Sequence, residues 1–288
     1  MVYSEMNVID NFIKNAKNQI IKVNKLNHHT ANLEAKLLLQ HVLKVNHAWL
    51  ISHANDVLTE DQALSFDALL KRRLDGEPIA YILGVREFYG LPLKVSAATL
   101  IPRPDTETLV DASLQKIPVD APWNILDLGI GTGAVALAIA KHRPKCAVMG
   151  VDASPEALAV AIENAQNLDL KNVSLIKSNW FSDLVGKRFD VIVSNPPYIA
   201  EADCHLTQGD LRFEPRSALA SGVDGLDDIR KIVHEAPNYL KANGWLMLEH
   251  GYDQAYSVAA LLKGHGFSQI DHAQDLAGTL RVTFGSIA

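Results

Sequence analysis

The sequence of 288 residues has few features of exported, metal-binding or membrane proteins. Cys146 and Cys204 are the only cysteines and lie far apart, so neither a disulfide framework nor a zinc site is expected. The longest aliphatic run, residues 134–140, is far shorter than the roughly 20 residues that cross a bilayer. Residues 1–6 contain an acid and no apolar segment, which predicts no secretion signal. We therefore expect a cytoplasmic protein with no metal and no membrane partner.

An excess of basic residues is also missing. The 27 lysines and arginines are outnumbered by 33 aspartates and glutamates, which gives a net charge of −6. This balance offers no global electrostatic reason to expect direct binding of nucleic acid. Hydrophobic residues make up 48% and charged residues 21%, as in folded soluble proteins. The length favours two domains.

The first third of the chain has the period of amphipathic helices. Apolar residues recur at i, i+3 and i+4 in three stretches. They are Val8, Ile9, Phe12, Ile13, Ala16 and Ile20, then Leu33, Leu37, Leu38 and Val42, and finally Ala63, Phe66, Leu69, Leu70 and Leu74. Such stripes usually form the core of a bundle. We predict a small helical domain over residues 1–80, and a β-hairpin linker over 81–105, where glycine and proline interrupt aromatic and β-branched residues.

After Trp123, short apolar runs alternate with helical periods. Five runs predict buried strands, at residues 124–128, 147–151, 173–176, 190–193 and 245–248. Helical stretches fall between most of them, which predicts an α/β domain with a doubly wound sheet over residues 106–288. Such sheets bind ligands at the carboxyl ends of their strands, so functional residues are expected just after the strands.

The first predicted strand ends in the glycine-rich segment Asp127-Leu128-Gly129-Ile130-Gly131-Thr132-Gly133. Glycines permit positive φ and allow a ligand to approach the backbone at a helix N-terminus. Asp152 ends the second strand, about 20 residues later, where a carboxylate that binds ribose hydroxyls is expected. The spacing also fits the dinucleotide fingerprint. These features indicate an adenosine-containing cofactor and leave nicotinamide or flavin chemistry open.

The fourth predicted strand is followed by Asn195-Pro196-Pro197-Tyr198. The Asn195 side-chain oxygen and the Pro196 carbonyl can both accept hydrogen bonds from one NH2 group, which turns its lone pair toward an electrophile. The prolines stiffen the turn, and Tyr198 can stack on a planar substrate. Asn-Pro-Pro is also a common turn former. Hydride transfer needs none of these groups, so the segment favours methylation of a planar amide or amino nitrogen.

This segment resembles the motif of methyltransferases that act on amino groups of adenine, cytosine or glutamine. Other segments are similar to the release factor glutamine methyltransferases, the PrmC or HemK family, and the likeness spans nearly the whole chain. These segments are residues 76–84, 86–90, 100–107, 212–215, 249–251 and 281–283. A sister family that methylates a ribosomal protein glutamine shares the motif at Asn195, but not Pro104-Asp105-Thr106-Glu107. The release-factor family is therefore favoured.

The resemblance implies a Rossmann-like sheet that binds S-adenosylmethionine and releases S-adenosylhomocysteine. Gly129, Gly131 and Gly133 would border the methionine part of this cofactor, Asp152 the ribose and Trp180 the adenine. Further predicted cofactor-binding residues are Asp127, Ile130, Thr132, Asn179 and Asn195. Asn179 stands where the family often has aspartate. Its amide oxygen can still accept from the adenine amino group, without charge assistance.

The same resemblance implies the substrate. The catalytic residues Asn195, Pro196, Pro197 and Tyr198 would bind the glutamine of the Gly-Gly-Gln motif in class 1 peptide chain release factors, which is methylated at N5.

Other readings stay open. An adenine N6 methyltransferase would use the same motif, although the acidic composition counts against it, and an interaction module without activity would not need Asn195 to Tyr198. The N-terminal helices either recognise the protein substrate or form a stabilising cap. His250, near a strand end, is expected to be structural.

Overall fold

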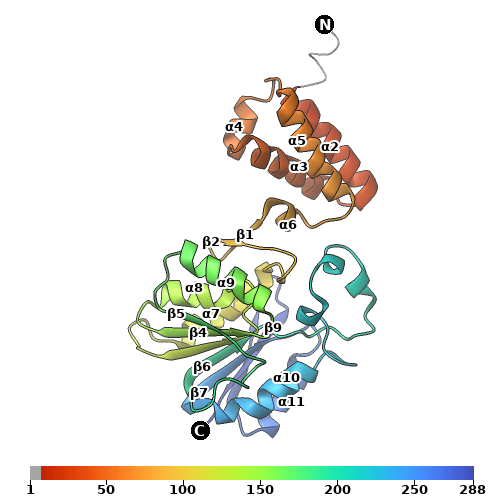
Figure 1. The fold of residues 1–288 in the computed structure, drawn as a ribbon. Helices are drawn as coiled ribbons and strands as arrows, with labels where there is room; N and C mark the ends of the chain where they lie inside the picture. The colour runs from red at the N-terminus through yellow and green to blue at the C-terminus, as the bar shows by residue number, and fades with distance from the viewer. Residues whose placement is uncertain (1–7) are drawn as a thin grey trace. The chain divides into compact units, whose positions relative to one another are not determined.

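The structure is a computed structural model that describes residues 8–288 (Figure 1). Residues 1–6, for which no secretion signal was predicted, lie outside the described residues. The chain forms two compact units, of which the first ends at Gly84 and the second comprises Val85–Ala288. Cys146 and Cys204 are both free thiols. In the described part of the chain, no helix combines the length and the apolar character needed to cross a membrane.

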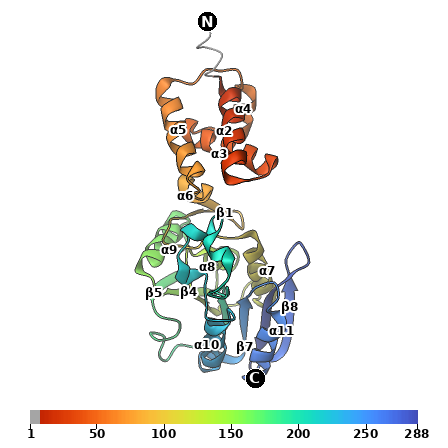
Figure 2. The ribbon, with the colours of Figure 1, turned by 90° about the vertical axis from the view of Figure 1, so that its right-hand side faces the viewer.

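The first unit is helical (Figure 2). Its elements are α2 (Ile9–Asn24), α3 (His28–Leu43), α4 (His47–Ser52), α5 (Glu60–Leu74) and α6 (Ile79–Leu83). The side chains of Asn27 and Asn46 accept hydrogen bonds from the first turns of α3 and α4. Thr59 and Gln62 form a capping box at the start of α5. These caps satisfy amides that have no partner inside a helix, and so fix where each helix begins.

The core of this unit confirms two of the three predicted stripes and corrects the third. Helices α2 and α5 bury residues of their predicted faces, such as Ile13 and Phe66. In α3, Leu38 is buried as predicted, but Leu33 is 48% exposed, and Ala31 and Ala35 are buried instead. Small alanines allow close packing of helices, so the buried face of α3 is rotated away from the leucine that suggested it.

The second unit begins with a β-hairpin. Strands β1 (Val85–Phe88) and β2 (Leu91–Lys94) pair antiparallel. The hairpin begins later than predicted, because residues 81–83 form the end of α6, which terminates at Gly84 with a φ of 72°. Lys94 N donates to Asn164 Oδ1 over 2.7 Å, and Asn164 Nδ2 donates back to Lys94 O over 3.0 Å. These bonds attach the hairpin to helix α9 (Pro155–Asn167) of the same unit.

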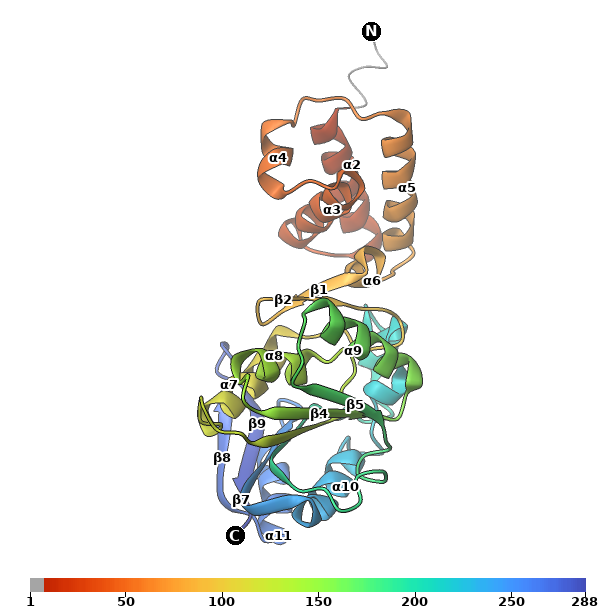
Figure 3. The same cartoon turned by 60° about the vertical axis from the view of Figure 1, so that its left-hand side comes forward.

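The sheet of the second unit is mostly parallel, as predicted (Figure 3). Its strands are β3 (Asn124–Leu128), β4 (Ala147–Asp152), β5 (Val173–Lys177), β6 (Phe189–Ser194), β7 (Leu240–Glu249), β8 (Ser268–Gln274) and β9 (Leu280–Ser286). Their order is β5-β4-β3-β6-β7-β9-β8, in which β9 pairs antiparallel with both β7 and β8 and all other pairs are parallel. Neither β8 nor β9 was predicted, because β8 is largely exposed and has no apolar run, and in β9 the polar residues Thr283 and Ser286 interrupt the apolar residues at the buried positions.

Helices cover both faces of this sheet (Figure 1). Helix α7 (Glu107–Lys116), α8 (Ala134–His142) and α9 pack on one face, and α10 (Asp227–Glu235) and α11 (Ala255–Gly264) on the other. Strands β4 and β5 lie on one side of β3, and β6 and β7 lie on the other. Where the strand order reverses in this way, the carboxyl ends of the strands border a crevice. The crevice is therefore expected after β3 and β6.

Short 3-10 turns complete the fold. They are η1 (Pro104–Thr106), η2 (Cys204–Thr207), η3 (Leu211–Phe213), η4 (Arg216–Ala218) and η5 (Ala236–Asn238). Turn η1 leads directly into α7, and η2 to η4 lie in the long connection from β6 to α10.

Candidate active site

The glycine-rich loop after β3 has the backbone that the sequence required. Gly129, Gly131 and Gly133 have φ values of 72°, 53° and 87°, a region that other residues avoid. Nothing lies within 4 Å of the position that a Cβ at Gly131 would occupy, so the loop is open there. A Cβ at Gly133 would lie 2.8 Å from Leu137 Cδ1. Gly133 thus permits packing at the start of α8, and Gly131 leaves space for a ligand.

Asp152, at the end of β4, is fixed by this loop. Its Oδ2 accepts a hydrogen bond of 2.9 Å from Gly131 N, and its Oδ1 accepts one of 2.9 Å from Ser154 N. A carboxylate offers about four acceptor positions, so both oxygens keep capacity for a ligand's hydroxyls. The carboxylate is therefore held in one orientation beside the loop.

Asp127 lies below the loop and is buried. Its Oδ2 accepts a hydrogen bond of 3.1 Å from Ala136 N, in the first turn of α8. Burial raises the pKa of this carboxyl to about 7, against the lowering effect of the Ala136 amide, and the charge of Asp152 adds to the rise. The Asp127 carboxyl group therefore changes between its protonated and ionised forms near neutral pH.

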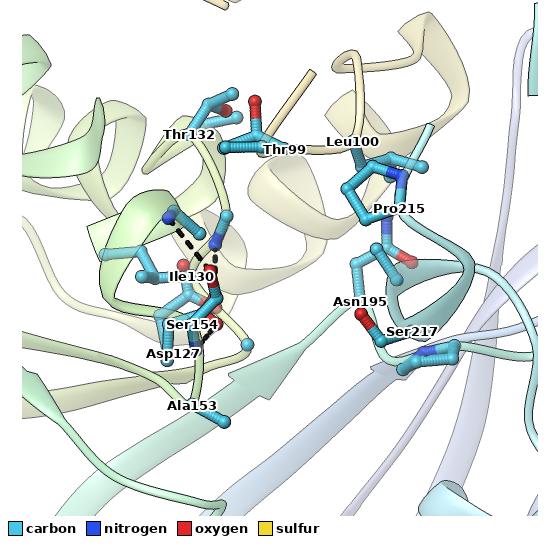
Figure 4. Close-up of a pocket in the computed structure, with 18 of the residues that line it drawn as sticks. Thr99, Leu100, Asp127, Ile130, Thr132, Ala153, Ser154, Asn195, Pro215 and Ser217 are labelled. Atoms are coloured by element: carbon cyan, nitrogen blue, oxygen red, sulfur yellow. Dashed lines mark hydrogen bonds between the residues drawn. The ribbon is translucent and has the colours of Figure 1, made fainter. Parts of the chain in front are cut away.

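A cavity of about 440 Å³ opens beside the loop. Figure 4 shows Asp127, Ile130 and Ser154 on one side of it and Asn195, Pro215 and Ser217 facing them. Many of the predicted site residues line this cavity: Asp127, Gly129, Ile130, Gly131, Thr132, Asp152, Asn179, Trp180, Asn195 and Pro197. Gly133, Pro196 and Tyr198 do not line it. The cavity thus brings together residues from the ends of several strands.

The facing wall was missed by the sequence reasoning. It comes from two segments, one before α7 and one between β6 and α10, and includes Thr99, Leu100, Pro102, Thr106, Pro215, Ser217, Ala218 and Ala220. Residues 100–107 and 212–215 carried the family likeness, but they follow no predicted strand, so no role was assigned to them. The family likeness of these two segments was the signal in the sequence that could have indicated a place in the site.

An ion pair joins these two segments. Glu214 is buried, accepts a hydrogen bond of 3.0 Å from Ile101 N and pairs with Arg103. Burial raises the pKa of Glu214, while the Arg103 guanidinium acts in the opposite direction. The pair ties the two segments of this wall together.

The Asn195-Pro196-Pro197-Tyr198 turn is anchored at both ends. Ser194 Oγ donates to Leu128 O over 2.7 Å, which connects the end of β6 to β3. Gln254 Nε2 donates to the Tyr198 carbonyl over 3.0 Å. A Cβ at Gly225 would lie 2.2 Å from the same carbonyl oxygen, so glycine is required for this approach. The turn is thus a rigid platform at the carboxyl edge of the sheet.

A second cavity, of about 60 Å³, adjoins the turn. It is lined by Leu100, Arg103, Asn195, Tyr198, Ile199, Leu211, Ala218 and Leu219. Asn195 lines both cavities, and its Nδ2 donates to Thr106 Oγ1 over 3.3 Å. With its NH2 group directed to Thr106, Asn195 keeps its side-chain oxygen as an acceptor.

Tyr198 faces a buried carboxyl group. Its hydroxyl donates to Glu249 Oε1 over 3.3 Å, at the carboxyl end of β7. Burial, followed by the charge of Glu249, raises the pKa of Tyr198 well above its usual range, so the phenol stays protonated. The neighbouring His250 is also buried, and its Nε2 lies 2.7 Å from Thr283 Oγ1. Burial lowers the pKa of His250, in keeping with the structural role expected for it.

One group of possible metal ligands occurs in the described residues. Asp203, Cys204 and His205 bring their ligand atoms within 4.8 Å of one another. Cys204 and His205 are exposed, and His205 Nδ1 lies 2.7 Å from Asp203 Oδ1. This hydrogen bond occupies atoms that a metal would need, and we assign no metal to the group.

Comparison with known proteins gives two family matches. Residues 22–84 match the family described as PrmC N-terminal domain, and residues 120–278 match the family described as methyltransferase domain. The chain is 48% identical over 252 residues to the release factor glutamine methyltransferase of Escherichia coli K12, covering 88% of this chain and 91% of that protein. It is 50% identical over 254 residues to the protein of the same name from Vibrio cholerae, covering 88% of each.

A solved structure supports the fold alone. A methyltransferase from Pyrococcus furiosus is 19% identical, covers 75% of this chain and 96% of its own, and superposes with a TM-score of 0.52.

Proposed function

The chain belongs to the release factor glutamine methyltransferase family, and on this premise we propose that it methylates the side-chain nitrogen N5 of a glutamine in class 1 peptide chain release factors. The methyl group comes from S-adenosylmethionine, and the glutamine is that of the Gly-Gly-Gln motif. The protein acts in the cytoplasm, where release factors work, and needs no direct contact with nucleic acid.

One observation carries this proposal. Asn195 lies on the wall common to a cavity of about 440 Å³ and a cavity of about 60 Å³. The larger has the size of small-molecule sites, and the smaller suits one side chain. A methyl donor bound in the larger cavity and a substrate side chain bound in the smaller one would meet at Asn195. This is the arrangement that a transfer between two bound molecules requires.

The residues of the larger cavity fit S-adenosylmethionine. Asp152 offers acceptors for ribose hydroxyls, and Gly131 leaves open space beside the backbone for the methionine part. The ring of Trp180 lies against Gly129, where a Cβ would be 3.4 Å away, and offers an apolar surface to the adenine. When bound, the cofactor supplies an electrophilic methyl group on a sulfonium.

The chain's own residues compensate for a weak nucleophile. A carboxamide nitrogen shares its lone pair with the carbonyl, so its position and orientation decide the rate. The Asn195 side-chain oxygen and the Pro196 carbonyl would accept both hydrogens of the NH2 group and fix its plane. Positioning of this kind supplies roughly 7–11 kcal/mol of a barrier. The nitrogen becomes acidic on methylation and loses a proton to water, either directly or through these oxygens.

Tyr198 is not the base in this scheme. Its raised pKa keeps the phenol protonated, and the hydroxyl already donates to Glu249. The tyrosine instead forms a wall of the smaller cavity, against which the planar amide packs.

The test is to incubate the protein with S-adenosylmethionine carrying a labelled methyl group, a purified release factor and total RNA. Peptide mass spectrometry then locates the label. We expect it on the glutamine of the Gly-Gly-Gln motif. Label on adenine in the RNA, with an untouched release factor, would replace this function by that of a nucleic-acid methyltransferase.

A further inference from the structure

Glu249 is a buried carboxyl group for which the reaction described above has no use. It ends β7, is 1% exposed and belongs to the segment 249–251 that carried part of the family likeness. Its Oε1 accepts the hydrogen bond from Tyr198, whereas its Oε2 has no partner of standard hydrogen-bond geometry among the described residues. Because such a carboxyl group is costly to bury, a function for it must be sought in its neighbours.

Those neighbours lead to Asn195. Thr106, in η1, lies close enough to the Glu249 carboxyl to lower its pKa, and the same hydroxyl oxygen accepts from Asn195 Nδ2. Tyr198 reaches the carboxyl from the other end of the motif. Glu249 is therefore connected to both ends of the Asn195 to Tyr198 turn, to Tyr198 directly and to Asn195 through Thr106. It lines neither cavity.

We propose that Glu249, acting through Thr106, is a positioning residue that turns the Asn195 side-chain amide so that its oxygen faces the substrate nitrogen. This inference rests on the proposed function. An ionised carboxylate only accepts hydrogen bonds, so the Thr106 proton points to it and the Thr106 oxygen is left to accept from Asn195 Nδ2. The amide oxygen of Asn195 is then free for the substrate.

Protonation of Glu249 removes the preference for this orientation of the Thr106 hydroxyl and the Asn195 amide. The carboxylic acid becomes a donor, Thr106 can accept from it and donate to the Asn195 oxygen, and the amide is free to rotate by 180°. Its NH2 group would then face the NH2 group of the substrate. The charge of Glu249 thus decides whether Asn195 presents its side-chain oxygen or its NH2 group to the substrate nitrogen.

The surroundings of Glu249 place this change near neutral pH. Burial raises its pKa to about 7, opposed by Thr106, Tyr198 and the charge of Arg281. Arg281, in β9, bonds Asp105 of η1 over 2.8 Å, and Asp105 acts on Glu249 in the raising direction. The rate should therefore fall as the pH is lowered through about 7.

The experiment compares single-turnover methylation of a release factor by wild type and Glu249→Gln at saturating S-adenosylmethionine, from about pH 6 to pH 8. Loss of orientation at a reacting group costs on the order of 10- to 100-fold. We expect such a fall at pH 8, the disappearance of the acidic limb seen in wild type, and little change in the Kd of S-adenosylhomocysteine. A wild-type rate with its acidic limb intact in Glu249→Gln would overturn the proposal.

A second pair of variants keeps the proposal testable if Glu249→Gln does not fold. Thr106→Val removes the hydroxyl at nearly constant volume and should lower the rate, whereas Thr106→Ser should restore it. Ser113→Ala is the matched control, since this buried hydroxyl donates to Leu109 O away from the site and its loss should leave the rate unchanged. Equal rates in Thr106→Val and Thr106→Ser would reject the proposal that Glu249 acts on Asn195 through the Thr106 hydroxyl.

A readout without substrate separates this inference from the proposed function. The side-chain NH2 signals of Asn195, observed by NMR in the resting protein, should shift as the pH passes about 7 in wild type and stay constant in Glu249→Gln. Absence of any methyl transfer by wild type would refute the function alone. An Asn195 signal that does not respond to Glu249 would refute the positioning role alone.

Discussion

Gly131 and Asp152 are joined by a hydrogen bond of 2.9 Å from the backbone amide of the first to Oδ2 of the second. The bond connects the loop after β3 to the end of β4. It makes Asp152 a support of the loop as well as a candidate ligand of the ribose. Asn195 lies across the cavity from Ile130 and Ser154, which are near this pair in the sequence (Figure 4), and its Nδ2 donates to Thr106 Oγ1 over 3.3 Å.

This separation predicts a division of labour. Asp152→Ala removes the ribose acceptor and loosens the loop, so loss of cofactor binding should dominate. Asn195→Ala leaves that side intact but removes the oxygen that orients the amide, so turnover should fall by about 100-fold or more. Calorimetry with S-adenosylhomocysteine, combined with single-turnover rates, measures the two effects. Equal loss of cofactor affinity in both variants would contradict the division.

Asp127 should make stability depend on pH. Its folded pKa is raised to about 7, so the folded state favours the protonated form, and stability is lost as the pH rises from about 4 to about 7. Asp127→Asn imitates the protonated form and should raise the free energy of unfolding by about 1–4 kcal/mol at pH 8, with a gap that closes toward acid pH. Urea unfolding at several pH values measures this difference.

The control for this prediction is Asp120→Asn, because Asp120 is exposed and forms an exposed ion pair with Lys145. Its effect should stay within about 0.5 kcal/mol. A constant difference between Asp127→Asn and wild type across the pH range would show that the carboxyl does not titrate in this window.

Removal of one partner of the buried ion pair in the helical unit should destabilise that unit strongly. Arg73 Nε lies 2.7 Å from Glu34 Oε2, with side chains only 5% and 8% exposed. Arg73→Met would leave the Glu34 charge in the core, at a cost of about 3–5 kcal/mol. The adjacent Arg72→Met breaks an exposed pair with Glu77 and should cost about 1 kcal/mol or less. Hydrogen exchange of amides in α3 and α5 compares the two, and similar losses would argue against the buried pair.

The sequence predicted those parts of the site that follow strands. Asp152 and Asn195 end or follow buried apolar runs, and the rule that such sheets bind ligands at the carboxyl ends of their strands places both near the crevice. Thr106, Pro215 and Glu249 could not be placed in the same way. The first two lie in irregular segments whose path is set by long-range contacts such as Arg103 with Glu214. Glu249 follows a predicted strand, but its role depends on Thr106 and Tyr198, which only the fold brings beside it.

The fold was predicted where periodicity was strong and missed where it was weak. Strands β3, β4, β6 and β7 are mostly buried because helices cover both of their faces. The edge strand β5, which was predicted to be buried, has no buried residue. The edge strand β8 is largely exposed and carries Asp271 and His272, so no apolar pattern marks it.

The helical unit is predicted to recognise the protein substrate. Removal of residues 1–84, at the boundary between the two compact units, should leave a protein that binds S-adenosylhomocysteine but methylates an intact release factor poorly. A short peptide containing Gly-Gly-Gln should lose much less rate than the whole release factor. Unchanged methylation of the intact release factor would reject the recognition role, and a truncated chain that fails to fold would favour a stabilising cap.

The last prediction concerns the residue that enters the smaller cavity. Glutamate in place of the glutamine turns a carboxylate toward the acceptor oxygens of Asn195 and Pro196. Each acceptor left without a donor costs roughly 1–3 kcal/mol, and the partial negative charge of both acceptor oxygens repels the carboxylate, so no product is expected. Asparagine keeps the amide but is one methylene shorter, and its nitrogen should stop about 1 Å short of the methyl group. Displacements of that size cost about 100-fold in rate.

The site should also require the two glycines that precede the glutamine. The Asn195 to Tyr198 turn is anchored by Ser194 and Gln254 and cannot retreat, so a side chain at the second glycine should obstruct the approach of the substrate backbone. Release factors carrying Gln, Glu or Asn at the tip, or Ala in place of that glycine, are to be compared by initial rate and by peptide mass spectrometry. Rates should fall in the order Gln, Asn and Glu, with Ala lowering the rate chiefly through KM. Efficient methylation of the asparagine variant would mean that the site does not fix the acceptor nitrogen, and the role given to Asn195 would have to be abandoned.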